Sequence, residues 1–98
     1  MINDYKKERL EKAARCLRTM AHPLRLMIIN LLSQREYSVQ ELEKELGSSQ
    51  SSISQHLSLL KDKDILASRR SAQQVFYRLQ SPRVLDLITL TRELFCKD

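Results

Sequence analysis

Apolar residues recur every three or four positions through much of the chain, which is the spacing of one face of an α-helix. The first stripe consists of Leu10, Ala13, Ala14, Leu17 and Met20. Pro23 then interrupts the pattern, and proline suits the first turn of a new helix. A second stripe follows from Leu24 to Leu32. The pattern therefore predicts two amphipathic helices at the start of the chain.

A tight turn joins the next two predicted helices. Ser38, with Glu41 three residues later, forms a capping box that starts the third helix. Gly47 ends this helix, because glycine adopts the left-handed conformation at little cost. The fourth helix has an inward-facing stripe of Ile53, Leu57 and Leu60. Two helices joined in this way predict a helix-turn-helix.

The period changes from 3.6 to 2 near the end of the chain. Val75, Tyr77 and Leu79 alternate with other side chains, and Ile65 and Ala67 lie upstream. This alternation predicts two short strands, joined through "RRSAQQ" into a β-hairpin with a basic, polar tip.

The last predicted helix begins at Pro82 and carries apolar residues on more than one face, up to Phe95. Such a helix needs more than one neighbour. A second copy of the chain would supply one, and the alternative is that the helix packs only on its own domain.

The order of these elements predicts a mainly α fold with a small β-hairpin, the winged helix-turn-helix. The 98 residues suit one domain, 1–98, and one glycine with two prolines disfavours a β-sandwich. No apolar run is long enough to cross a membrane. The charged N-terminal segment lacks the apolar centre of a signal peptide, so we expect a cytoplasmic protein.

The net charge of +5 and the pI near 9.5 favour a polyanionic partner, most simply nucleic acid. The alternative is a basic protein with no such partner. Residues 1–30 carry +4, residues 31–60 carry −2 and residues 61–98 carry +3. Electrostatic attraction therefore comes mostly from outside the central third.

The segment "SSQSSISQHLSLLK" gives the fourth helix a polar N-terminal half. Short side chains that donate and accept hydrogen bonds suit a recognition helix in the major groove of double-stranded DNA. The predicted DNA contacts on this helix are Ser49, Gln50, Ser51, Ser52, Ser54, Gln55 and His56. The alternatives are a solvated helix start with Ser48 or Ser49 as a plain N-cap, and a packing role for His56.

Cationic and polar side chains around that helix are predicted to hold the phosphates. The residues are Lys61, Arg69, Arg70, Gln74 and Arg78. In this division of labour the wing positions the protein while the helix reads bases, and affinity depends strongly on salt.

The chain resembles the ArsR/SmtB family of bacterial regulators in "MAHPLRLMIINLL", "SVQELEKELGSSQSSISQHLSLLKDKDIL" and "RRSAQQVFYRL". The resemblance implies a homodimer that binds a palindromic operator and represses until an inducer binds. It places the helix-turn-helix at 38–62, the wing at 65–79 and the dimer surface at 5–20 and 82–96.

The metal sites of the family do not carry over. One uses cysteines in the helix that corresponds to "VQELEKEL", which has none, and the other uses a histidine that "SPRVLDLITLTRELFCKD" lacks. We therefore expect no metal site and no cofactor. A subgroup that senses oxidants or reactive sulfur has a cysteine late in the last helix, as Cys96 is here, although its second cysteine corresponds to Asn30 rather than to Cys16.

Cys16 and Cys96 leave three interpretations open. They sense an oxidant or reactive sulfur and so release the protein from DNA, they only pack, or they form a metalloid site with help from a second subunit. A regulator without an inducer is a further alternative. We do not expect an enzyme, because no nucleophile–base motif, phosphate loop or HExxH motif is present. A wing used purely for protein contacts is disfavoured by its arginines.

Overall fold

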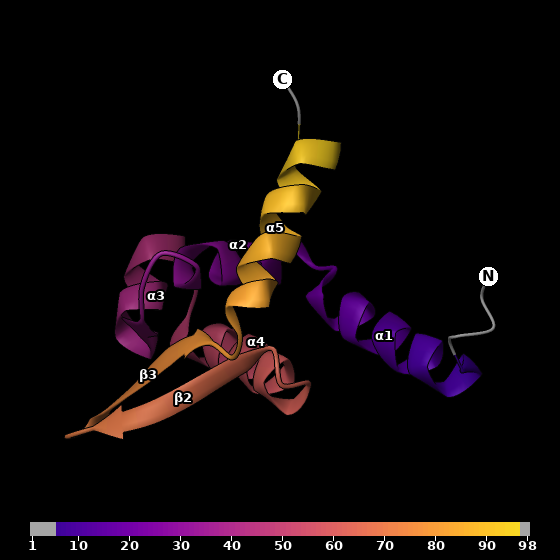
Figure 1. Ribbon diagram of the computed structural model, residues 1–98. Helices are drawn as coiled ribbons and strands as arrows, with labels where there is room; N and C mark the ends of the chain where they lie inside the picture. Colours follow the sequence, from indigo (N-terminus) through magenta and orange to yellow (C-terminus); the bar gives the residue numbers. More distant parts are fainter. Residues whose placement is uncertain (1–5, 97–98) are drawn as a thin grey trace.

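The computed structural model describes residues 6–96, and within them the chain forms five helices and one small sheet (Figure 1). The elements are α1 (Lys7–Met20), α2 (Pro23–Leu32), β1 (Tyr37–Ser38), α3 (Val39–Leu46), α4 (Gln50–Asp62), β2 (Leu66–Ser71), β3 (Gln74–Leu79) and α5 (Pro82–Phe95). The predicted winged helix-turn-helix, mainly α with a β-hairpin, is confirmed.

The predicted helix signals act as expected at the centre of the chain. The Ser38 Oγ accepts a hydrogen bond from the Glu41 N–H at 3.1 Å, and the Ser38 N–H donates to Glu41 Oε1 at 2.8 Å. Both halves of the capping box are thus present at the start of α3. Gly47 ends α3 in the left-handed conformation, with φ at 66°. These local choices set the turn between α3 and α4.

The core lies between α2, α3, α4 and the sheet. Its fully buried side chains are Ile28, Ile29, Leu42, Ile53, Leu57, Leu60 and Leu66. The three residues predicted to face inward from α4 are all among them. The helix α4 is therefore fixed by its apolar stripe, and its polar side faces outward.

Two features of the sheet differ from the prediction. The strand β1 pairs with β3 and makes a third strand, in the order β1-β3-β2, where only a hairpin was expected. The predicted loop over 69–74 is wrong, because β2 and β3 continue through the polar residues and leave only Ala72 and Gln73 as the turn. Backbone pairing does not require apolar side chains, so the ladder extends beyond the alternating apolar pattern.

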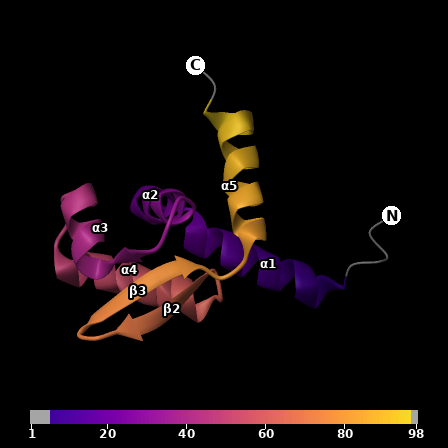
Figure 2. The same cartoon turned by 60° about the vertical axis from the view of Figure 1, so that its left-hand side comes forward.

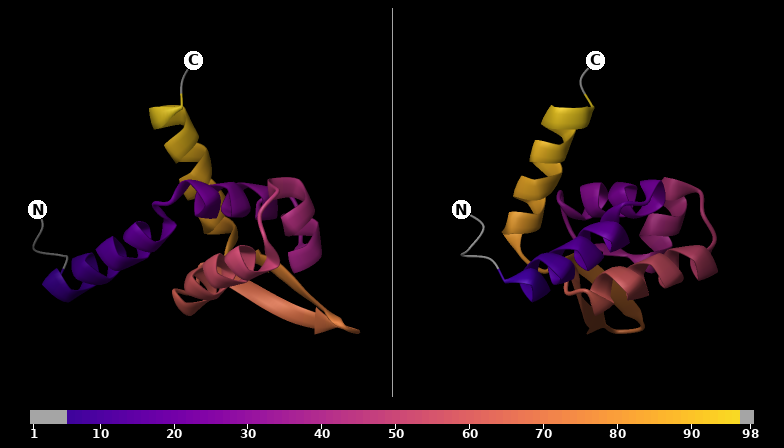
Figure 3. Two further views of the ribbon diagram at one scale, coloured as in Figure 1. Left: turned by 180° about the vertical axis from the view of Figure 1, so that it is seen from behind. Right: turned by 90° about the vertical axis from the view of Figure 1, so that its right-hand side faces the viewer.

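The helices α1 and α5 extend away from this core as two arms (Figures 2 and 3). The longest dimension is 49 Å and the radius of gyration is 14.6 Å. A compact domain of this length has a radius of gyration of about 13 Å. Tyr5, the first residue of the predicted dimer helix, lies outside the described residues. None of the helices in residues 6–96 combines the length and the hydropathy that a membrane crossing requires.

Candidate nucleic-acid interface

The N-terminal half of α4 presents the polar side chains that were predicted to contact DNA. Ser49 is the N-cap, and its Oγ accepts a hydrogen bond from the Ser52 N–H at 3.2 Å. Gln50, Ser51 and Gln55 are exposed, whereas Ser52, Ser54 and His56 are half-buried. Ser49 thus has a structural task as well as a polar surface position.

The tip of the wing lies beside the beginning of α4. Gln50 of α4 and Gln73 and Gln74 of the hairpin line a common groove of about 150 Å³. The remaining residues of this groove are Ser38, Val39, Gln40 and Val75. The structure therefore brings together two predicted contact residues, Gln50 and Gln74, that lie 24 positions apart in the sequence.

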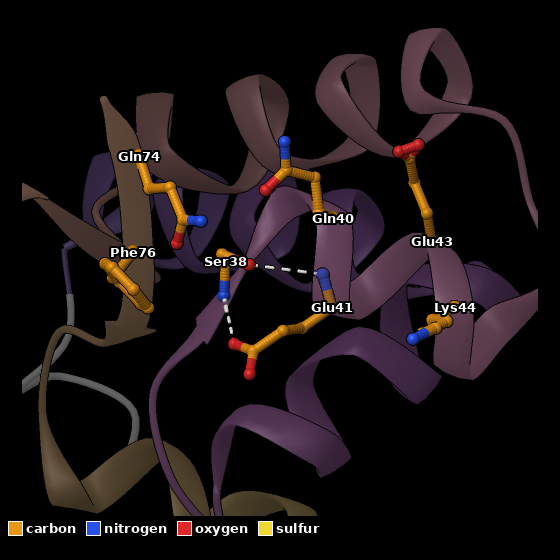
Figure 4. A pocket seen from close by; sticks show the side chains of 7 residues that line it. All are labelled: Ser38, Gln40, Glu41, Glu43, Lys44, Gln74 and Phe76. Atoms are coloured by element: carbon orange, nitrogen blue, oxygen red, sulfur yellow. Dashed lines mark hydrogen bonds between the residues drawn. The ribbon is translucent and has the colours of Figure 1, made fainter. Parts of the chain in front are cut away.

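A second groove, of about 530 Å³, lies between α3 and β3 (Figure 4). Figure 4 shows the Glu41 carboxylate turned toward the Ser38 backbone, as the capping box requires. Glu43 and Lys44 also line the groove, so its charged residues sum to a negative charge. This groove is a poor place for a phosphate, unlike the neutral groove beside Gln50.

The three arginines of the wing lie on opposite faces of the sheet. Side chains alternate along a strand, and the register pairs Arg70 with Val75 and Arg69 with Phe76. Arg70 therefore shares a face with Ser68, which accepts a hydrogen bond from the Lys61 Nζ of α4 at 2.8 Å. Arg69 and Arg78 point to the other face. The sequence pattern did not predict this division, because it had placed Arg69 and Arg70 in a loop rather than in a strand.

Arg69 is held by an acidic residue that sequence reasoning missed. Its Nη2 donates to Glu36 Oε1 at 2.8 Å, and its Nε lies 3.0 and 3.1 Å from the two carboxylate oxygens. The guanidinium also lies 4.9 Å from the centre of the Phe76 ring. The hydrogen bond from Arg69 lowers the pKa of Glu36, and the same pair raises the pKa of Arg69. No sequence signal links these residues, because β1 had not been predicted.

His56 is also part of a cluster that the sequence did not reveal. Its Nδ1 accepts a hydrogen bond from the Arg25 Nε of α2 at 3.0 Å, and its ring lies 4.7 Å from that of His22. Burial, followed by the charges of Arg25 and His22, lowers the pKa of His56. His56 thus packs against other residues and remains half-exposed.

The two cysteines lie on different arms and both are free thiols. Cys16 is half-buried on α1 and lines a hollow of about 250 Å³ with residues of α1 and the end of α4. Cys96 is the exposed C-cap of α5, whose end points away from the body in Figures 1 to 3. Among residues 6–96, no three His, Cys, Asp or Glu side chains gather as metal ligands would.

The comparison with known proteins adds the family to this geometry. The profile of the bacterial regulatory protein family arsR matches residues 22–68, which run from the start of α2 into β2. The biofilm growth-associated repressor of Xylella fastidiosa is 35% identical over 96 residues, which cover 98% of this chain and 84% of that protein. The chain belongs to the ArsR family. Members of this family are DNA-binding transcription regulators rather than enzymes.

Solved structures of other ArsR-family proteins share this fold. The repressor BigR from Xylella fastidiosa aligns with a TM-score of 0.86 at 35% identity, over all of both chains. HlyU from Vibrio cholerae aligns with a TM-score of 0.84 at 39% identity, over 94% of this chain and 100% of its own. A homodimeric winged helix-turn-helix DNA-binding domain from Mycobacterium bovis aligns with a TM-score of 0.85 at 28% identity, over 94% and 85%.

Proposed function

We propose that this ArsR-family protein is a homodimeric repressor that binds a palindromic operator and leaves it when an inducer acts on Cys16 or Cys96. The observation that carries the proposal is the surface of α4. Its N-terminal half is polar and uncharged, lies beside the wing tip and is backed by a buried apolar stripe. That surface suits base readout in the major groove.

Exposed apolar residues on the arms support a dimer. On α1 and α5 these are Leu10, Leu17, Leu87, Leu90, Leu94 and Phe95. Monomeric proteins rarely leave so many large apolar side chains together in water. A second copy that covers both arms would place two α4 helices on the two half-sites of a palindrome. The relative from Mycobacterium bovis is homodimeric.

We assign the DNA contacts by their position in the fold. Gln50, Ser51, Ser52, Ser54, Gln55 and His56 read bases or neighbouring phosphates, and Ser49 does so through its hydroxyl while it caps α4. Lys61 and Arg70 bind the backbone from the face shared with α4, and Gln74 and Arg78 bind it from the other face. Arg69 contributes less, because a phosphate must compete with the Glu36 carboxylate.

The inducer proposal depends on the thiols. Both are free, one on each arm of the dimer surface, so oxidation or reaction with sulfur would act where the subunits meet. A metal- or metalloid-responsive repressor is the second candidate, and a regulator without an inducer is the third. The relatives include a repressor from Xylella fastidiosa and a transcriptional activator from Vibrio cholerae, so the direction of regulation also belongs to the proposal.

The test is binding to a duplex from the promoter upstream of the coding sequence, with reduced protein and after mild polysulfide or diamide treatment. Mass spectrometry of the same samples reports the thiol state. We expect reduced protein to bind and treated protein to dissociate, while the Cys16→Ser, Cys96→Ser double variant binds under both conditions. If treated wild-type protein keeps its affinity, the thiol switch is wrong. If reduced protein binds no duplex, the DNA-binding proposal itself is wrong.

A further inference from the structure

The recognition helix is joined to the two preceding helices through one arginine. Arg25, near the start of α2, donates from Nε to His56 Nδ1 at 3.0 Å. It also donates from Nη1 to the Thr19 carbonyl oxygen near the end of α1 at 2.8 Å. Arg25 is half-buried, and both contacts use donors of one rigid guanidinium plane. The geometry thus fixes where His56 Nδ1 lies and what faces it.

This contact determines where the ring proton of His56 resides. A neutral imidazole has one donor nitrogen and one acceptor nitrogen, and an arginine cannot give up its proton in a protein. Because Arg25 Nε is a donor, His56 Nδ1 must be the acceptor and Nε2 must carry the hydrogen. A positively charged His56 would set two N–H groups against each other. The hydrogen bond therefore forms with only one of the three forms of the ring, the neutral Nε2–H tautomer, and not with the Nδ1–H tautomer or the cation.

The neighbouring side chain favours the same form. His22, the N-cap of α2, accepts a hydrogen bond from the Leu24 N–H through Nδ1 at 3.1 Å, and its ring contacts that of His56 at a tilt of 47°. Burial opposes a positive charge on His56, and such a charge would also place a second cation beside Arg25. These causes lower the pKa of His56 below the ordinary histidine value of about 6.5. The ring is therefore neutral at pH 7.

The other ring nitrogen is available to a ligand. No hydrogen bond joins His56 Nε2 to a residue in 6–96, and no buried side-chain nitrogen or oxygen among these residues lacks a partner. Nε2 must therefore reach solvent. His56 is the last of the predicted contacts on α4 and lies about two helical turns after the N-cap, Ser49.

We propose that Arg25 fixes His56 in the Nε2–H form, so that the recognition helix offers DNA a hydrogen-bond donor, and only a donor, at this position. The inference rests on the proposed DNA-binding function. A fixed donor recognises an acceptor of DNA, which is either a purine N7 in the major groove or a phosphate oxygen. It rejects the amino groups of adenine and cytosine. Arg25 is then a positioning residue for readout.

The first test uses nitrogen NMR of the free protein, without DNA. The chain has two histidines, so a His22→Gln variant assigns the His56 signals. We expect a pyridine-like shift at Nδ1 and a pyrrole-like shift at Nε2. Arg25→Met, which keeps the apolar stem, should give a mixture of tautomers, and Arg25→Lys, which keeps a cationic donor, should restore part of the preference. A pyrrole-like Nδ1 in the wild-type protein would show that the proposal is wrong.

The same samples give a pH profile. The groups facing His56 are Arg25 of α2 and His22 of the preceding loop, and both oppose protonation. His56 should titrate below about 6.5 in the wild-type protein and at higher pH in Arg25→Met. Because the unfolded chain binds this proton more readily, stability is complete above about pH 6.5 and falls as the pH drops toward the folded pKa. An unchanged His56 titration in Arg25→Met would contradict the proposal.

The second test identifies the acceptor, with the duplex that the wild-type protein selects from a random-sequence pool as the probe. Purines are replaced one at a time by their 7-deaza forms, and phosphates by methylphosphonates. We expect one replacement to weaken wild-type binding about five-fold and to leave the His56→Ala variant unaffected. A 7-deaza effect indicates base readout, and a methylphosphonate effect indicates a backbone contact. If every replacement weakens both proteins equally, His56 makes no such contact.

The two tests fail separately. A protein that binds no duplex loses the proposed function, while the NMR result still decides whether Arg25 fixes the tautomer. If the His56→Ala variant binds DNA with the same affinity as the wild-type protein, the proposed DNA-binding function stands and the inference about His56 is wrong.

Discussion

The helices α4 and α5 have nearly equal length and similar apolar spacing, yet their apolar side chains have opposite fates. Ile53, Leu57 and Leu60 of α4 are 0% exposed, whereas Leu94 and Phe95 of α5 are 61% and 79% exposed. The apolar stripe of α4 packs against the core, and it occupies only one face of the helix. In α5 only Ile88 is buried and Val84 packs partly against the core, whereas Leu87, Leu90, Leu94 and Phe95 are exposed.

The difference shows that periodicity predicts that a helix has an apolar face, but it does not predict what covers that face. The buried stripe of α4 holds its polar side at a fixed position, which readout of DNA requires. Within residues 6–96, nothing covers Leu94 and Phe95 of α5. We therefore distinguish a body, residues 23–79, which is complete in one chain, from two arms, α1 and α5, which we propose are completed by a second copy.

The largest expected effect separates a buried leucine from an exposed one. Leu57→Ala should lower the free energy of unfolding by about 2–5 kcal/mol, because it leaves a cavity in the core. Leu94→Ala removes the same atoms from an exposed position and should change it by less than about 0.5 kcal/mol in the monomer. Urea unfolding followed by circular dichroism, at protein concentrations low enough for the sample to be monomeric, measures both. Equal losses at the two sites would remove the distinction between body and arms.

The second prediction concerns the arms alone. The double variant Leu90→Lys, Leu94→Lys should shift the protein from dimer to monomer, because charge would be buried in an apolar interface. Analytical ultracentrifugation reports the mass, and circular dichroism should show an intact fold. DNA affinity should fall together with dimer formation. The control is Arg83→Lys, which keeps the charge at an exposed position of α5. A double variant that stays dimeric would locate the interface elsewhere.

The sequence was sufficient for features that depend on neighbouring residues. The capping box at Ser38, the glycine end of α3 and the apolar stripe of α4 are local signals, and each one is found in the structure. The short strand β1 was missed because two residues carry too little periodicity to be recognised. The ends of the hairpin were misplaced because polar residues continue the backbone ladder.

The candidate site was predicted as a set of residue types rather than as an arrangement. The polar half of α4 could be predicted because serine and glutamine are uncommon together at a helix start before an apolar stripe. The partners of Arg69 and His56 could not, since Glu36 and Arg25 lie 33 and 31 positions away. Contacts over such distances depend on packing between elements. A residue type therefore predicts what a side chain can bind, and its partners determine whether it is free to do so.

The third prediction compares two serine caps. Ser38→Ala should destabilise the body by about 1 kcal/mol, because it removes the acceptor for the Glu41 N–H from a buried position. Ser81 caps α5 in a similar way, with its Oγ accepting from the Arg83 N–H at 3.1 Å. If α5 is an arm, Ser81→Ala should lower the free energy of unfolding of the monomer by less than Ser38→Ala does. Unfolding measured in the Leu90→Lys, Leu94→Lys variant provides that background, and a larger loss at Ser81 would contradict the comparison.

The smallest effect is expected at the wing tip, which belongs to the body. Ala72 has a φ of 56°, a conformation that side chains with a Cβ adopt at a cost of about 1–2 kcal/mol. Glycine relieves that strain but loses about 0.5–1 kcal/mol of chain entropy, so Ala72→Gly should stabilise the protein by about 0.5 kcal/mol. The matched control is Asp64→Gly at a φ of 59°, where aspartate already tolerates this conformation and the gain should be smaller. Thermal unfolding should show the gain in stability for Ala72→Gly. The dimer dissociation constant should not change, because the wing tip is remote from α1 and α5. A changed dissociation constant would show that body and arms are coupled.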